Sequence, residues 1–212
     1  MTMKRLAGGV LETVLRYVAA FLVIGLLWQA GTAAFGDAVL PSPVATGRLF
    51  AESLSVYPSL NWQKKFKGQF AQENFNGNYI YYLKPETFMN LSGDAIIEAS
   101  HFYKIKPEEI LVVHDELELP IGTMSLKWSG GLGGHNGLRS TKANLGTADF
   151  WRLRFGIGRP EHDDISGYVL SDFSKAETEV LEKIFSCGQV LLDKLKTTEP
   201  DKLLEEYKKV KV

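Results

Sequence analysis

From Asn61 onward, short apolar runs and turn residues alternate in a pattern that predicts a compact α/β domain. Two strands, Phe66 to Gln72 and Tyr79 to Leu83, flank Asn76-Gly77, which is a strong signal for a two-residue hairpin turn. Later strands are predicted over Ile110 to Val113, Thr123 to Trp128 and Trp151 to Ile157.

Helices are predicted between and after these strands. One covers Ser92 to Tyr103, and another begins near Asn136 to Leu138, after a glycine-rich loop. Ser174 to Glu177 forms a capping box for a helix whose apolar positions share one face. Those positions are Val180, Leu181, Ile184, Leu191 and Leu195. Pro200 begins a shorter terminal helix.

The first 55 residues form an atypical apolar segment that precedes the α/β domain, which we assign to residues 56–212. The stretch from Leu15 to Thr46 resembles the start of a permease subunit of a binding-protein-dependent transporter. Such a subunit needs several membrane spans, and no later window approaches eighteen apolar residues. The transporter resemblance therefore covers this piece alone.

Within that segment, Tyr17 to Gly36 is twenty residues without a charge, which is long enough to span a bilayer. Lys4, Arg5 and Arg16 precede it and would place the N terminus in the cytoplasm. The alternative is a buried central strand and turn beginning at Val18, because central parallel strands are also apolar throughout. Both interpretations stay open at this point.

Composition narrows the class of protein. With 45% hydrophobic and 23% charged residues, the chain of 212 residues is neither disordered, collagen-like nor a coiled coil. Its single cysteine, Cys187, excludes a disulfide scaffold and a cysteine-based zinc site. A domain of the α/β or α+β class in a reducing compartment fits these numbers.

The net charge of −1 conceals one strongly basic stretch. Residues 122–159 carry six Lys or Arg and one Asp, and they are also the most glycine-rich part of the chain. That combination favours a surface that faces phosphates. The alternative is a basic stretch that is simply solvated.

His114-Asp115 follows the apolar strand, at the edge where open α/β sheets bind ligands. The alternative for Asp115 is a residue that caps a turn or a helix. Because the two residues are adjacent on an extended segment, His114 is expected to point to the side opposite Asp115. Glu116 and Glu118 add nearby carboxylates, but ligands from other segments are missing, so no metal is predicted.

Two asparagines stand at predicted helix starts. Asn136 lies in the run Gly133 to Gly137, where its amide could donate to a carbonyl or a phosphate and the loop N–H groups would favour an anion. The run lacks the Lys-Ser/Thr ending of a P-loop, and His135 could be a turn residue without chemistry. Asn90 is either an N-cap or a residue that binds substrate.

Four strings together resemble, in order and spacing, bacterial-type peptidyl-tRNA hydrolase. They are Lys84 to Gly93 (KPETFMNLSG), Val113 to Leu117 (VHDEL), Gly131 to Arg139 (GLGGHNGLR) and Arg152 to Pro160 (RLRFGIGRP). The resemblance extends from roughly Asn61 to the C terminus.

This resemblance implies a single α/β domain with a twisted mixed β-sheet flanked by helices, acting as a cytoplasmic monomer without metal or cofactor. It implies hydrolysis of the ester between peptide and tRNA, with a His base that activates water and an Asp that orients this His. Asp115 matches the orienting Asp, and Asn90 and Asn136 match the asparagines that bind substrate near the ester. Residues that match the family's substrate and tRNA contacts are Phe88, Met89, Gly134, His135, Lys127, Arg139 and Arg154.

The base itself has no counterpart in the sequence. The family's first strand runs into a Gly-Leu-Gly-Asn-Pro-Gly turn and then an Arg-His-Asn, whereas the first His here is His101, inside a predicted helix. Leu22 to Leu26 mimics the strand, but Leu27-Trp28 replaces the turn. We therefore expect an impaired peptidyl-tRNA hydrolase. The alternatives are a non-catalytic protein that binds the tRNA acceptor end and a protein anchored in the membrane through Tyr17 to Gly36.

Overall fold

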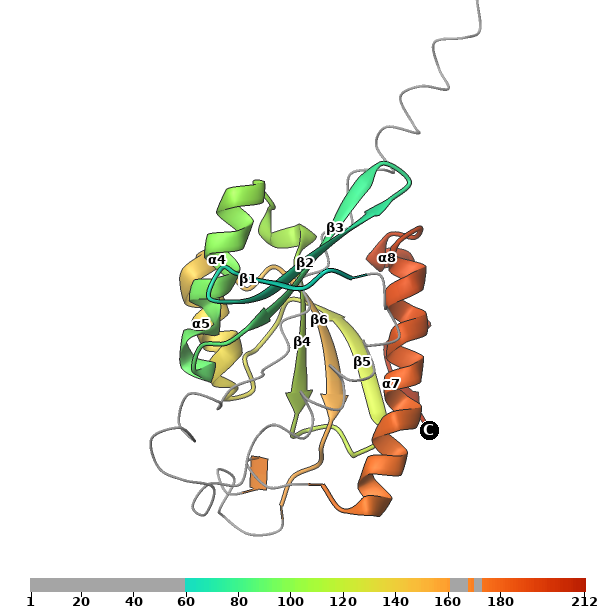
Figure 1. Cartoon of the computed structure of the whole chain (residues 1–212). Coiled ribbons are helices and arrows are strands. Elements are labelled where there is room, and N and C mark those ends of the chain that lie inside the picture. The colour runs from blue at the N-terminus through green and yellow to red at the C-terminus, as the bar shows by residue number, and fades with distance from the viewer. Residues whose placement is uncertain (1–59, 161–167, 170–172) are drawn as a thin grey trace, which may run out of the picture.

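Two hydrogen-bonded sheets and four α-helices make up the described part of the computed structural model, which covers residues 60–160, 168–169 and 173–212 (Figure 1). An antiparallel sheet has the strand order β1-β2-β3, and a mixed sheet has the order β4-β6-β5-β7. The prediction of an α/β fold with a mixed sheet and flanking helices is confirmed.

The antiparallel sheet is built around the predicted hairpin. Strands β2 (Gly68–Phe75) and β3 (Asn78–Pro85) pair along their whole length, and Asn76 and Gly77 form the turn with φ of 53° and 86°. A turn with two positive φ angles explains why Asn-Gly was informative. The prediction that the first strand begins at Phe66 is wrong, because Phe66 and Lys67 have φ of 54° and 55° and form a second tight turn.

That second turn connects β2 to a strand that the sequence did not predict, β1 (Gln63–Lys65). The mixed sheet contains β4 (Leu111–Glu116), which runs parallel to β6 (Trp151–Gly156), and β5 (Thr123–Trp128), which runs antiparallel to β6. A second unpredicted strand, β7 (Val210–Lys211), covers the outer edge of β5. The prediction that His114 and Asp115 follow the apolar strand is wrong, because β4 extends to Glu116 and includes both residues.

The helices predicted within the described residues are all present. They are α4 (Ser92–Tyr103), α5 (Asn136–Leu145), α7 (Lys175–Leu195) and the short α8 (Pro200–Leu203). The capping box before α7 is formed, because Ser174 Oγ accepts from Glu177 N and the Glu177 carboxylate accepts from Ser174 N. Two 3-10 turns, η2 (Met89–Leu91) and η3 (Pro107–Glu109), precede α4 and β4.

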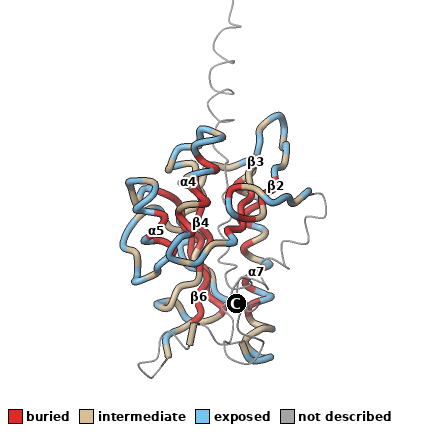
Figure 2. The backbone as a smooth tube through the Cα atoms, turned by 60° about the vertical axis from the view of Figure 1, so that its left-hand side comes forward, coloured by how far each residue is buried: buried red, intermediate tan, exposed pale blue. Residues whose placement is uncertain are grey.

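The mixed sheet has apolar residues packed on both of its faces, and the buried positions concentrate along β4 and β6 (Figure 2). On β4, Leu111 and Val113 join the cluster that includes α7, whereas Val112 joins the cluster that includes α4 and α5. This alternation places His114 on the same face as Val112, toward the N terminus of α5.

The apolar stretch Tyr17 to Gly36 lies outside the described residues, so both interpretations of it stay predictions. Within residues 60–160, 168–169 and 173–212, no helix has the length and apolar character that a membrane span requires.

Candidate active site

Three segments converge at the carboxyl end of β4: the strand itself, η2 with the start of α4, and the glycine-rich loop that leads into α5. Gly93 N donates to Ser140 Oγ at 2.9 Å, which joins the start of α4 to the middle of α5. A Cβ on Gly137 would lie 2.7 Å from Met89 Sδ, so the two predicted asparagine segments are in direct contact. The fold thus gathers motifs that lie far apart in the sequence.

Asp115 and His135 form the central polar pair. Asp115 Oδ1 lies 3.4 Å from His135 Nε2, and the side chains are 28% and 16% exposed. His135 is also the N-cap of α5, because its Nδ1 accepts a hydrogen bond from Leu138 N at 3.2 Å. That acceptor role fixes the neutral tautomer of His135, with the proton on Nε2 and directed at Asp115.

His114 lies against this pair, although the sequence suggested that it points away. Its ring centroid is 5.0 Å from that of His135, and its Nδ1 donates to the backbone carbonyl of Asp115 at 2.6 Å. With the proton on Nδ1, the lone pair of Nε2 is buried and has no hydrogen-bond partner among the described residues. His114 and Asp115 are consecutive residues of β4, so their side chains leave the strand on opposite faces. The ring of His135, which lies near the carboxyl end of β4, contacts both side chains.

Burial and neighbouring charges shift the pKa values of His114, Asp115 and His135 in different directions. Burial, together with the charge of His135, lowers the pKa of His114 to about 3, so this ring is neutral at pH 7. Burial tends to raise the pKa of Asp115, but the hydrogen bond and charge of His135 outweigh it and lower the pKa to about 2. Burial tends to lower the pKa of His135, but Asp115 outweighs it and the net shift is upward.

These shifts predict a window of pH in which the pair stabilises the fold. The folded pKa of Asp115 lies below its ordinary value of 3.8, so its contribution is present above that pH and is lost as the pH falls toward about 2. The folded pKa of His135 lies above 6.5, so its contribution is present below that pH and is lost as the pH rises. The difference in unfolding free energy between the native protein and Asp115→Asn, measured by urea titration, should therefore peak near pH ~5. A difference that does not vary with pH would contradict this coupling.

The two predicted asparagines are both exposed; Asn136 follows His135 directly, and Asn90 follows Met89, which lies against Gly137. Asn90 lies in η2, and neither its side chain nor that of any residue near it caps α4, whose N-cap is Leu91, so the N-cap alternative is wrong. Asn136 Oδ1 accepts from Arg139 Nη1 at 3.2 Å, and the capping role belongs to His135. Phe88, next to this group, is 53% exposed.

The glycine-rich loop between β5 and α5 depends on positive φ angles at Gly130 (107°), Gly133 (56°) and Gly134 (76°). It is anchored by Arg152 of β6, which donates to the carbonyl oxygens of Gly131 at 2.5 Å and Gly130 at 2.9 Å. Sequence reasoning missed the role of Arg152. Strand alternation and the neighbouring glycines do not reveal that a cation lies beneath the loop.

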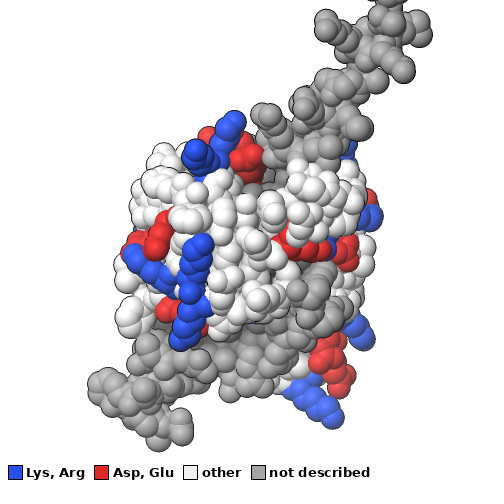
Figure 3. All heavy atoms as spheres, turned by 45° about the horizontal axis from the view of Figure 1, so that its top comes forward, with Lys and Arg blue, Asp and Glu red and all other residues white. Residues whose placement is uncertain are grey.

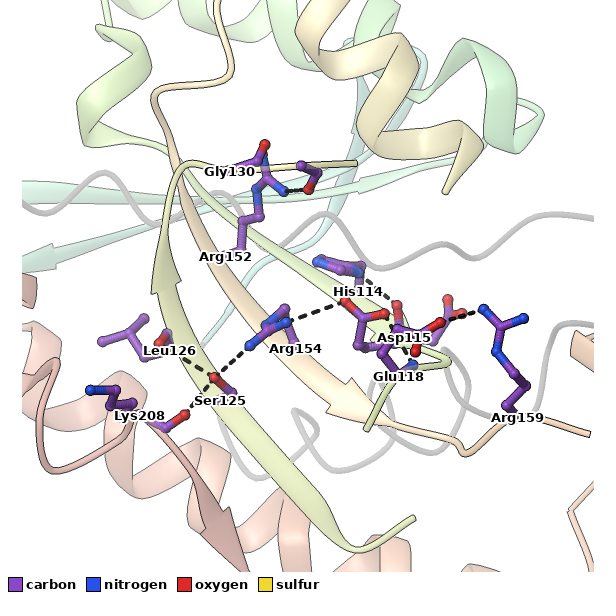
Figure 4. A network of polar contacts seen from close by, with 12 residues as sticks. His114, Asp115, Glu118, Ser125, Leu126, Gly130, Arg152, Arg154, Arg159 and Lys208 are labelled. Atoms are coloured by element: carbon purple, nitrogen blue, oxygen red, sulfur yellow. Dashed lines mark hydrogen bonds and ion pairs between the residues drawn. The ribbon is translucent and has the colours of Figure 1, made fainter. Parts of the chain in front are cut away.

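The predicted tRNA-facing cations occupy different environments. Lys127 is partly exposed and lies close to Gly130, and Arg139 is exposed. Arg154 is 20% exposed, lies 3.4 Å from Glu116 Oε2 and donates to Ser125 Oγ at 3.0 Å (Figure 4). The structure therefore leaves Lys127 and Arg139 available to a ligand, whereas a phosphate would have to compete with Glu116 for Arg154.

Charges of both signs are interspersed on the face shown in Figure 3, in keeping with the net charge of −1. Among the described residues, no group of three His, Cys, Asp or Glu side chains could hold a metal ion. The chemistry that these residues can offer is therefore that of a carboxylate–imidazole pair with exposed amides beside a cationic loop.

The family model of peptidyl-tRNA hydrolase matches residues 46–212. The chain belongs to the peptidyl-tRNA hydrolase family. A peptidyl-tRNA hydrolase of Desulfitobacterium hafniense is 50% identical over 143 residues, which cover 67% of this chain and 77% of that protein. One of Haemophilus influenzae is 54% identical over 128 residues, 59% of this chain and 66% of that protein.

Solved structures of the peptidyl-tRNA hydrolase family share the fold. The crystal structure of peptidyl-tRNA hydrolase from Acinetobacter baumannii matches with a TM-score of 0.77 at 28% identity, covering 90% of this chain and 94% of that chain. The match to the family model begins at residue 46, so residues 1–45 lie outside it. The sequence has four histidines, and the first of them is His101.

Proposed function

We propose that this protein acts on peptidyl-tRNA at the ester between the peptide and the 3′ end of the tRNA. The observation that carries the proposal is the convergence of the Asp115–His135 pair with two exposed asparagines and a cationic glycine-rich loop. Hydrolysis by activated water uses a carboxylate that orients an imidazole, together with nearby amides that hold the ester.

In this proposal each site residue has a separate role. Asp115 is the orienting carboxylate, and Asn90 and Asn136 bind the substrate near the ester through exposed side-chain amides. Phe88 offers an exposed ring to the terminal base, and Met89 supports the neighbouring Gly137. Residues that contact the tRNA or line its path are Gly134, His135, Lys127, Arg139 and Arg154.

We further propose that hydrolysis is impaired because no described residue can act as the general base. His135 Nε2 carries the proton that is directed at Asp115, and the only lone pair, on Nδ1, accepts from Leu138 N, so no lone pair of His135 is free to accept a proton from water. His114 Nε2 has a free lone pair, but burial keeps water from it and lowers its pKa to about 3. A base with so low a pKa is a poor proton acceptor at pH 7.

The same engagement of His135 favours a second candidate, a protein that binds the tRNA acceptor end without cleaving it. Binding needs the asparagines, Phe88 and the loop, and all of these are exposed in the structure. The monomeric state, the cytoplasmic location and the absence of a cofactor that the resemblance implies stay predictions.

Binding of uncharged tRNA at increasing salt tests the nucleic-acid interface that both candidates share. Lys127 has no acidic partner among the described residues, so Lys127→Ala should reduce the slope of log affinity against log salt by about 1, because one fewer phosphate is neutralised. Lys64→Ala is the matched control, since Lys64 is 87% exposed on the other sheet and should leave the slope unchanged. An affinity for tRNA that does not change with salt concentration would contradict the proposed nucleic-acid interface.

A further inference from the structure

Arg152 is a cation buried inside the fold without an acidic partner. The residue is 2% exposed, and its guanidinium donates to two successive carbonyl oxygens of the loop, those of Gly130 and Gly131. Its other close contact is the ring of Phe150, whose centroid lies 5.0 Å from Cζ. Arg154, two residues along β6, faces Glu116, whereas no carboxylate among the described residues pairs with Arg152.

Burying a cation whose hydrogen-bond partners are carbonyl oxygens costs free energy. Burial, together with the charge of Arg154, lowers the pKa of Arg152, although the charge of Glu116 opposes this shift. A neutral side chain of similar size would fill the same space more favourably. Such an unfavourable group is expected where it sets the geometry of a site and not where it merely fills a core.

The hydrogen bonds of Arg152 determine which way two peptide groups of the loop face. In a trans peptide, the N–H points opposite to the carbonyl of the preceding residue. Figure 4 shows Arg152 directed at Gly130. Because the carbonyls of Gly130 and Gly131 turn in toward the guanidinium, the N–H groups of Gly131 and Leu132 turn away from it. Gly131 is exposed, and no backbone N–H from Gly130 to Gly134 has an acceptor among the described residues.

Outward N–H groups on successive residues form a concave donor site that suits an anion. Lys127 adds a charge to it, because a Cβ built on Gly130 would lie 3.0 Å from Lys127 Nζ. The buried guanidinium beneath the loop contributes a second, fixed positive charge at the same place. A phosphate group matches this combination of donors and cations.

We propose that Arg152 is a positioning residue that orients the N–H groups of Gly131 and Leu132 to bind a phosphate group of the tRNA. The inference rests on the proposed function for the identity of the ligand, but the orientation of the loop by Arg152 is independent of it. Arg152 itself touches no substrate, since its side chain is buried on the opposite side of the loop.

The test compares the native chain with Arg152→Lys, which keeps the charge but cannot hold two carbonyls in a fork. Inorganic phosphate is titrated into ¹⁵N-labelled protein, and uncharged tRNA is titrated separately. In the native chain the amide signals of Gly131 and Leu132 should shift with phosphate. In Arg152→Lys these shifts should disappear, and the Kd for tRNA should rise about tenfold with an unchanged salt slope. Arg159→Lys is the matched control, because Arg159 pairs with Glu118 at the surface and its replacement should change neither result.

Full retention of the amide shifts and of the tRNA affinity in Arg152→Lys would overturn the inference. A native chain that shows the phosphate shifts but binds no tRNA would refute the proposed function and leave the role of Arg152 supported. Where Arg152→Lys fails to fold, the side-chain signals of Arg152 in the native chain decide the question. A guanidinium held by two carbonyls gives separate, slowly exchanging Nη1 and Nη2 signals, and a single averaged signal would overturn the inference.

Discussion

Replacing residues 1–45 with the corresponding segment of the Haemophilus influenzae relative is expected to increase hydrolysis of peptidyl-tRNA by at least ~100-fold. Residues 1–45 lie outside the family match, and the sequence has no histidine before His101. The relative's segment would supply the strand, the turn and the base that the resemblance implies. A positioned general base typically contributes about 10² to 10⁴-fold, which sets the size of the expected gain.

Asp115→Asn in the grafted protein is the control for this gain. The change keeps the shape of the side chain but removes the charge that steadies an imidazolium, so the restored rate should collapse toward that of the ungrafted chain. A grafted protein that folds and binds tRNA but gains no activity would show that the sequence of residues 1–45 does not limit catalysis.

Gly93→Ala is expected to lower the free energy of unfolding by about 3 kcal/mol. A Cβ at this position would lie 2.2 Å from the carbonyl oxygen of Ser140 and 2.5 Å from its carbonyl carbon. Both atoms belong to the backbone of α5, so α4 would have to move away from α5. The hydrogen bond from Gly93 N to Ser140 Oγ would be lost as well.

Urea denaturation measures this loss directly, and Gly131→Ala is its matched control. A Cβ on Gly131 meets no atom within 4 Å, so this variant should unfold with nearly the native free energy. Equal stabilities for the two variants would show that α4 and α5 are not packed as closely as the structure has them. Because Asn90 lies in the turn that precedes α4 and Asn136 begins α5, Gly93→Ala should also weaken binding of tRNA.

Elements with strong local chemistry could be predicted from the sequence. Asn76 and Gly77 accept positive φ angles at little cost, so the hairpin was evident from two residues. The reciprocal bonds of Ser174 and Glu177 fixed the start of α7 in the same way. The bounds of α4 followed from its polar start and its periodic apolar face.

Features that depend on contacts between distant segments could not be predicted. Strand β7 is two residues long and exists because β5 offers an open edge, and no pattern within Val210–Lys211 announces it. Phe66 was read as the first residue of a strand because of its apolar character, but its φ of 54° belongs to a turn that the packing of β1 on β2 imposes.

The candidate site could likewise be predicted only in part from the sequence. The strings that carry Asn90, Asp115 and Asn136 were identified by their resemblance to the peptidyl-tRNA hydrolase family, and the fold brings their segments together. That His135 would cap α5 and bond Asp115 at once was not visible, because a histidine in a glycine-rich run is ambiguous until the helix start is placed. The place of Arg154 beside Glu116 depended on the register of β4 and β6.

The rate at which the purified, unaltered chain hydrolyses peptidyl-tRNA in a single turnover tests most directly whether the protein lacks a general base. We expect a rate at least ~100-fold below that of the Haemophilus influenzae relative under the same conditions. We also expect His114→Ala to leave the residual rate nearly unchanged, because burial keeps water from its ring. A rate equal to that of the relative would contradict this expectation, and its loss in His114→Ala would show that the described residues do contain a general base.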